Sequence, residues 1–171
     1  MNNYPPFIPP PDIGEAQPDT WSKDQAKTYF DWLIHIIPGR VTSLLEYFGE
    51  SADTAPEILL YQLGKKVGDA AKSGEFVQAG KLTKSGFAVA ADLGLLVAQL
   101  LLADSGVCAK WVLVTQKRSV HYNHPVIQGN SNLQLNPITG SMTEFAYATR
   151  NQWDSAIWLN TFLHWKSVFS K

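Results

Sequence analysis

The sequence predicts a predominantly helical α+β fold, with about five helices around a central apolar helix and a small β-sheet or hairpin near residues 110–136. Three observations lead to this prediction. Apolar residues recur at helical spacing along several long segments. Residues 85–103 are apolar nearly all round, which is typical of a helix enclosed by others. Residues 111–115 carry the β-branched and aromatic side chains that favour a strand.

Length and composition predict one globular domain over residues 21–171, preceded by a proline-rich N-terminal arm over residues 1–20. With 45% hydrophobic and 17% charged residues, the chain has the balance of an ordinary globular protein. Its 14 basic and 15 acidic side chains form no long run of either sign, so we expect neither nucleic acid nor a membrane as partner. The single cysteine, Cys108, cannot form an internal disulfide, and the amino terminus lacks the features of a secretion signal. We therefore expect a reducing, cytoplasmic location.

The arm contains the sequence YPPFIPPP at residues 4–11. Proline fixes φ and lacks an N–H, so this segment favours polyproline II or irregular structure over a helix or strand. We expect the arm before Asp12 to be dispensable for folding.

The first helix is expected to begin after Ser22, because Ser22 and Gln25 have the spacing of a capping box. Its apolar pattern is interrupted by Pro38 and Gly39 and then resumes until Gly49, which favours a left-handed helix end. The interruption predicts either two consecutive helices or one sharply kinked helix.

Thr54 and Glu57 repeat the capping-box spacing and predict a helix over about residues 56–67. Glycines make residues 68–84 poorly periodic, so we expect a loop with a short helical turn there. The central helix over 85–103 is nearly long enough to span a bilayer. A buried core helix is favoured instead, because Asp92 near its middle would be costly in lipid and the amphipathic helices before it need a surface to cover.

The strand over 111–115 is expected to turn and return over 120–127. Ser141 and Glu144 form a third capping-box pattern, which predicts one last helix running to about residue 169. Large aromatic side chains are enriched at interfaces, so we expect the aromatic face of this helix to be a partner surface or a face for self-association into a homo-oligomer. The alternative is that the proline-rich arm covers it. The face consists of Trp158, Phe162, Trp165 and Phe169.

Asp92 is the first candidate for a functional residue, because buried carboxylates cluster at functional sites. It is a general base or substrate anchor in one interpretation. In the interpretation we favour it is a structural, buried polar residue, bonded to a tryptophan N–H, a tyrosine hydroxyl, Lys110 or Arg118.

Two histidines, His121 and His124, lie in a predicted strand or loop without the spacing of a metal site, and Cys108 lacks the setting that activates a thiol. The sequence contains no phosphate-binding glycine motif. We therefore expect no metal, no cofactor and no catalytic residues.

Several segments resemble a group of small uncharacterised bacterial proteins. They are W-S-x-x-x-A-x-x-Y-F-x-W at 21–32, followed by Arg40 and paired leucines, then D-L-G-L at 92–95, K-W at 110–111, Y-N-H-P-V-I-x-G at 122–129 and L-N-P at 135–137. Members of this group look like cytoplasmic accessory proteins, and some resemble immunity proteins that neutralise contact-dependent or secreted toxins. The resemblance implies a protein partner, which is a toxin for the immunity-type members, and brings no enzyme activity with it.

Two classes of function follow. The first is a non-catalytic protein-binding accessory protein of the bacterial immunity or antitoxin type. The alternative is an enzyme of unfamiliar type with a pocket built around Asp92 and His121 or His124. A deep pocket that joins these groups would favour the enzyme.

Overall fold

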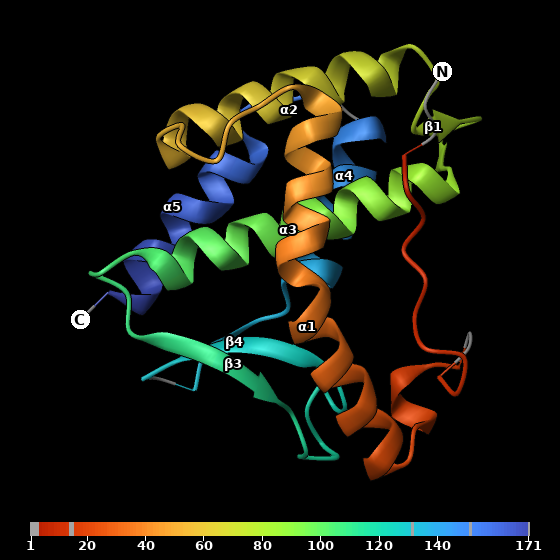
Figure 1. Cartoon of the computed structure of the whole chain (residues 1–171), viewed down its shortest axis with the longest axis vertical. Coiled ribbons are helices and arrows are strands. Elements are labelled where there is room, and N and C mark those ends of the chain that lie inside the picture. The colour runs from red at the N-terminus through yellow and green to blue at the C-terminus, as the bar shows by residue number, and fades with distance from the viewer. Residues whose placement is uncertain (1–3, 14–15, 131, 151, 171) are drawn as a thin grey trace.

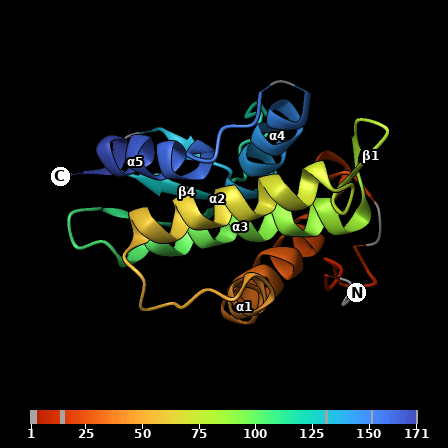
Figure 2. The ribbon, with the colours of Figure 1, turned by 90° about the horizontal axis from the view of Figure 1, so that it is seen from above.

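A computed structural model describes residues 4–13, 16–130, 132–150 and 152–170. Within these residues the α+β class is confirmed: five α-helices accompany two small antiparallel sheets. The long helix α3 (Lys84–Ala103) runs through the middle of the molecule (Figure 1). On one side of it lies α1 (Lys23–Phe48), and on the other lie α4 (Pro137–Arg150) and α5 (Ile157–Phe169), as Figure 2 shows from above.

The central helix α3 is enclosed by the rest of the chain. The hydroxyl of Thr83 caps it by accepting a hydrogen bond from the Gly86 N–H at 3.0 Å. In length and composition α3 would suffice to cross a membrane, yet 72% of its most apolar window is buried inside the protein. Its side chains from residue 88 to residue 98 are all buried, Asp92 included, which is the arrangement expected of a core helix.

The helix α1 is a single continuous helix that passes through Pro38, so of the two predicted alternatives the pair of separate helices is wrong. Pro38 lies on the exposed side of α1, where water can replace the hydrogen bond that its missing N–H would donate to the carbonyl of Ile34. The predicted capping box is confirmed: Ser22 and Gln25 bond each other's backbone N–H reciprocally. Gly49 ends the helix with φ 64°, the left-handed conformation that glycine adopts readily.

The helix α2 (Pro56–Lys72) begins where predicted but continues past residue 67. The capping box predicted from Thr54 and Glu57 is wrong, because the N-cap is Ala55, whose side chain makes no hydrogen bond. Gly68, expected to start a loop, lies inside the helix. Glycine is required there because the segment before α5 approaches closely: a Cβ on Gly68 would be 2.2 Å from the indole nitrogen of Trp153. After the helix comes a hairpin rather than a loop with a helical turn, formed by β1 (Val77–Gln78) and β2 (Lys81–Leu82).

The predicted sheet is confirmed as three antiparallel strands in the order β3-β4-β5. They are β3 (Ala109–Leu113), β4 (Pro125–Gly129) and β5 (Gln134–Leu135). Trp111 pairs with Ile127, and Ile127 pairs with Leu135. The sheet lies beside α3 and leads directly into α4.

The single last helix predicted for the C-terminal part is two helices, α4 and α5. The capping box at Ser141 is wrong, because α4 begins at Pro137 and Asn136 caps it by accepting from the Thr139 N–H at 3.1 Å. Ser141 lies one turn further on and is buried, and its hydroxyl accepts a hydrogen bond from the indole N–H of Trp158 at 2.8 Å.

The aromatic face proposed as a partner surface is corrected by this arrangement. Trp158, Phe162 and Phe169 are only 0%, 1% and 3% exposed, because α5 packs against α2 and α3, with the Trp158 ring beside Phe145 of α4 and Phe169 beside Gly129 of β4. Trp165 is half-buried and its ring lies against Phe169. These side chains therefore belong to the core, apart from the edge of Trp165.

The described part of the N-terminal arm runs back alongside the domain (Figure 1), and its side chains pack against it. Tyr4 is 2% exposed and Ile13 is 3% exposed. The ring of Phe7 contacts Trp32 on α1, with 5.6 Å between ring centroids. The described residues of the arm thus cover α1 and the Asp92 region, and not the aromatic face of α5.

Candidate functional site

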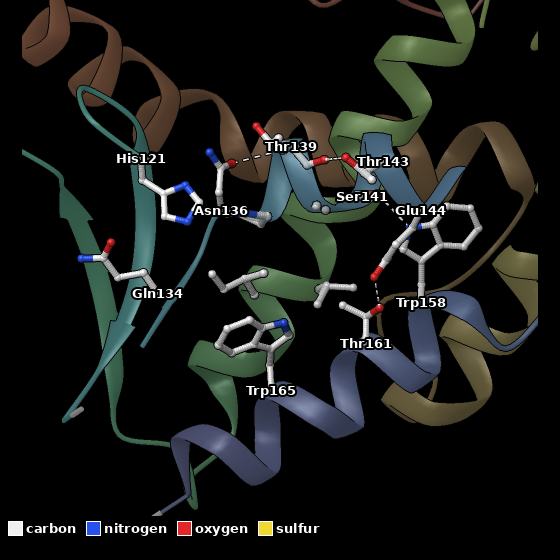
Figure 3. A pocket seen from close by; sticks show the side chains of 15 residues that line it. His121, Gln134, Asn136, Thr139, Ser141, Thr143, Glu144, Trp158, Thr161 and Trp165 are labelled. Atoms are coloured by element: carbon white, nitrogen blue, oxygen red, sulfur yellow. Dashed lines mark hydrogen bonds between the residues drawn. The ribbon is translucent and has the colours of Figure 1, made fainter. Parts of the chain in front are cut away.

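A pocket of about 410 Å³ lies between α3, α4, α5 and the sheet, and we call it the α4 pocket (Figure 3). Its volume is within the range of small-ligand sites, which is roughly 300–1,000 Å³. The apolar part of its lining includes Val97, Leu135, Pro137, Trp158 and Trp165. The polar part consists of His121, Gln134, Asn136, Thr139, Ser141, Thr143, Glu144 and Thr161.

Close contact between α3 and α4 shapes one wall of this pocket. At Gly94 an added Cβ would lie 2.1 Å from the carbonyl oxygen of Pro137, so only glycine permits this approach. The first turn of α4 is closed by its own cap, since the N–H groups of Thr139 and Gly140 both bond Asn136. The bond from Trp158 to Ser141 fixes the indole ring that forms part of the opposite wall.

Glu144 has the most unusual environment in the lining. Its Oε1 accepts a hydrogen bond from the Thr161 hydroxyl at 2.6 Å, whereas its buried Oε2 has no hydrogen-bond partner among the described residues. Burial raises the pKa of Glu144, and the bond from Thr161 opposes that rise. A buried carboxylate oxygen without a donor is energetically costly, so a ligand that supplies a donor would be stabilised here.

His121 lies at the other end of the pocket from Glu144, beside Gln134 (Figure 3). Burial lowers the pKa of His121, and the neighbouring His124 lowers it further. The centroids of the two imidazole rings are 6.5 Å apart, and Nδ1 of His124 lies 3.0 Å from the backbone oxygen of Tyr122. His121 therefore enters the pocket as a neutral ring at neutral pH.

Asp92 is buried, as predicted, but it does not line the α4 pocket. Arg40 bonds its carboxylate with two nitrogens, Nε to Oδ1 at 2.9 Å and Nη2 to Oδ2 at 2.6 Å, and the Tyr4 hydroxyl donates to Oδ2. Of the partners that we expected, a tyrosine hydroxyl is present, while the cation is Arg40 rather than Lys110 or Arg118. Burial raises the pKa of Asp92, and the bonds from Arg40 and Tyr4 oppose it by stabilising the carboxylate.

The pocket required by the enzyme alternative is not formed by these groups. His121 lines the α4 pocket, but neither Asp92 nor His124 does so. The thiol of Cys108 lies 3.3 Å from Oδ1 of Asn130 and is half-buried. Within the described residues, no three His, Cys, Asp or Glu side chains gather in a way that could hold a metal ion.

Sequence reasoning missed Glu144 as a site residue, because its spacing from Ser141 was interpreted as a helix start. A signal was nevertheless present. Ser141, Phe145 and Ala148 are buried at positions i, i+4 and i+7, and Glu144 at i+3 shares that helix face. A carboxylate on the buried face of an amphipathic helix indicates a pocket or a buried partner.

Comparison of the chain with models of protein families, with curated proteins and with solved structures found no significant match.

Proposed function

We propose that this protein is a non-catalytic binding protein whose partner is another protein, as in bacterial pairs of toxin and immunity protein. The observation that supports binding is the α4 pocket, a preformed site with fixed aromatic walls and one carboxylate oxygen left without a donor. The sequence resemblance supports a protein partner and a cytoplasmic location, in which Cys108 stays reduced.

The lining favours binding over chemistry. A catalytic base is held by a third group and acts on a nucleophile within hydrogen-bond reach. Glu144 is bonded by Thr161 alone, and its second oxygen has no orienting partner among the described side chains. The pocket's other titratable group, His121, lies at the opposite end (Figure 3).

Co-expression with the toxic product of an adjacent gene tests this proposal. The wild-type chain is expected to restore growth and to form a stable complex with that product. Gly140→Phe should abolish both effects by filling the pocket, since a Cβ there meets only Leu135, at an ordinary 3.9 Å. Gly39→Phe is the matched control, because Gly39 lies on the exposed side of α1 with nothing within 4 Å of an added Cβ.

Absence of any protection by the wild-type chain would contradict the immunity proposal. Full protection by a folded Gly140→Phe variant would contradict the assignment of the partner site to the α4 pocket. Thermal unfolding of both variants shows whether they fold.

A further inference from the structure

We propose that the α4 pocket binds an organic ammonium group, supplied either by a small amine or by a lysine side chain of a partner protein. This inference rests on the proposed function, because it names the chemistry of the group that the pocket receives. It goes beyond that function, because neither the resemblance nor the presence of a pocket determines the charge of the ligand.

The charge of the lining points to a cation. Glu144 is its one acidic side chain, and the lining contains no lysine or arginine. His121 is the remaining titratable group, and it is neutral at neutral pH because its surroundings lower its pKa. The nearest candidate cation on α5, Lys166, pairs with Asp104 at 2.7 Å and does not reach into the lining. The pocket thus carries an acidic group that no cation of its own lining neutralises.

The geometry of Glu144 leaves one specific position for the ligand. The Thr161 hydroxyl donates to Oε1, whereas Oε2 is buried and has no donor among the described residues, so an incoming N–H bonds Oε2 once the Glu144 side chain turns toward the cavity. A bond from an ammonium group to a carboxylate is charge-assisted and stronger than a bond between neutral groups. It would also end the unpaired state of a buried oxygen, which adds to the gain on binding.

The walls favour an organic cation over a metal ion. A hard metal ion requires about six oxygen ligands, usually with several carboxylates among them, whereas Glu144 is the one carboxylate of the lining. Trp165, which is half-buried, instead presents an indole ring that attracts ammonium groups, while Val97 and Leu135 can pack against a hydrocarbon chain.

An anion is disfavoured by the same geometry. The N-terminus of a helix binds anions through free N–H groups. In α4, however, Asn136 already accepts from the N–H of Thr139 at 3.1 Å and of Gly140 at 2.9 Å. A carboxylate or phosphate in this pocket would also meet Glu144.

Calorimetric titration with matched probes tests the inference. The probes are butylammonium, 1-butanol as its neutral counterpart and butyrate as the anion. We expect wild-type protein to bind butylammonium about tenfold or more tightly than 1-butanol and not to bind butyrate. Glu144→Gln should remove this preference and leave 1-butanol binding unchanged. Asp154→Asn is the matched control, because Asp154 is exposed and lies outside the lining of the pocket.

Equal binding of butylammonium and 1-butanol by the wild type would overturn the inference, as would unchanged butylammonium binding by Glu144→Gln or failure of the amine to bind. The source of the ammonium group is distinguished by a second pair of probes, Nα-acetyl-lysine methylamide and its norleucine counterpart. Tighter binding of the lysine amide than of butylammonium indicates a partner side chain, and the reverse order indicates a small amine.

The two sets of experiments distinguish the charge of the ligand from the location of the partner site. If the pocket binds neutral probes only, while Gly140→Phe still abolishes protection, the assignment of the partner site is supported and the positive charge proposed for the ligand is wrong. If butylammonium binds as expected, while Gly140→Phe leaves protection intact, the cation site stands and the partner binds elsewhere.

Discussion

Asp92 shows how a single residue connects segments that are far apart in the sequence. Its carboxylate is fully buried near the middle of α3 and accepts hydrogen bonds from Arg40 on α1 and from Tyr4 in the arm. Arg40 also donates to the backbone oxygens of Pro5 and Pro6, at 3.1 and 2.9 Å. The ion pair therefore holds the arm, α1 and α3 together. This arrangement supports a structural role for Asp92.

Removal of the carboxylate alone is expected to destabilise the fold strongly. In Asp92→Leu the guanidinium of Arg40, whose side chain is 13% exposed, loses its counter-charge while remaining largely buried. We predict a loss of about 3–5 kcal/mol in the free energy of unfolding, measured by urea denaturation. The double variant Asp92→Leu with Arg40→Leu should recover most of this loss, because no unpaired charge is left. If Asp92→Leu unfolds at the same urea concentration as the wild type, the ion pair between Asp92 and Arg40 contributes nothing to stability.

The ends of the helices illustrate which features of an element the sequence could predict and which it could not. The capping box at Ser22, the left-handed end at Gly49 and the apolar α3 were predicted, because each depends on neighbouring residues. The C-terminal end of α2 was not predicted, because Gly68 resembles a helix end in the sequence. Its reason for being glycine is the close approach of Trp153, which is remote in sequence. Local spacing likewise could not distinguish a helix start at Ser141 from a helix interior.

Two alanine substitutions are predicted to change stability in opposite directions. Gly39→Ala should stabilise the protein by about 1 kcal/mol, because its Cβ meets nothing and alanine favours the helix. Gly64→Ala should destabilise it despite the same helix preference, since its Cβ would lie 2.0 Å from the backbone oxygen of Ser155. Thermal and urea unfolding of the two variants provide the comparison. A stabilised Gly64→Ala protein would show that α2 and the segment before α5 are less closely packed than described.

The N-terminal arm is predicted to be part of the folded core, which reverses the expectation from its proline content. Deletion of residues 2–11 removes Tyr4 from beside Asp92 and Phe7 from Trp32. A Tm lowered by several degrees is therefore expected for the shortened chain. Tyr4→Phe, which keeps the ring and loses one hydrogen bond to a charged group, should lower the Tm by less than the deletion does. An unchanged Tm after the deletion would restore the interpretation of the arm as dispensable.

At the scale of the whole molecule, the α4 pocket is assembled from segments that meet only in the fold. Its lining joins Val97 of α3, Leu135 of β5, Glu144 of α4 and Thr161 of α5, with His121 from the loop before β4. None of these positions forms a motif in the sequence, because the spacing between them is set by tertiary packing. The sequence predicted the class of fold and the buried Asp92, whereas the site required the arrangement of the helices.

Binding of a cationic group in the α4 pocket can be followed residue by residue by nuclear magnetic resonance. In the ¹H–¹⁵N spectrum, addition of butylammonium is predicted to shift the indole N–H of Trp165 and the backbone amides of Glu144 and Thr161 saturably. The same titration of Glu144→Gln should leave these signals in place, while Asp154→Asn responds like the wild type. Saturable shifts confined to other parts of the chain, or none at all, would contradict the claim.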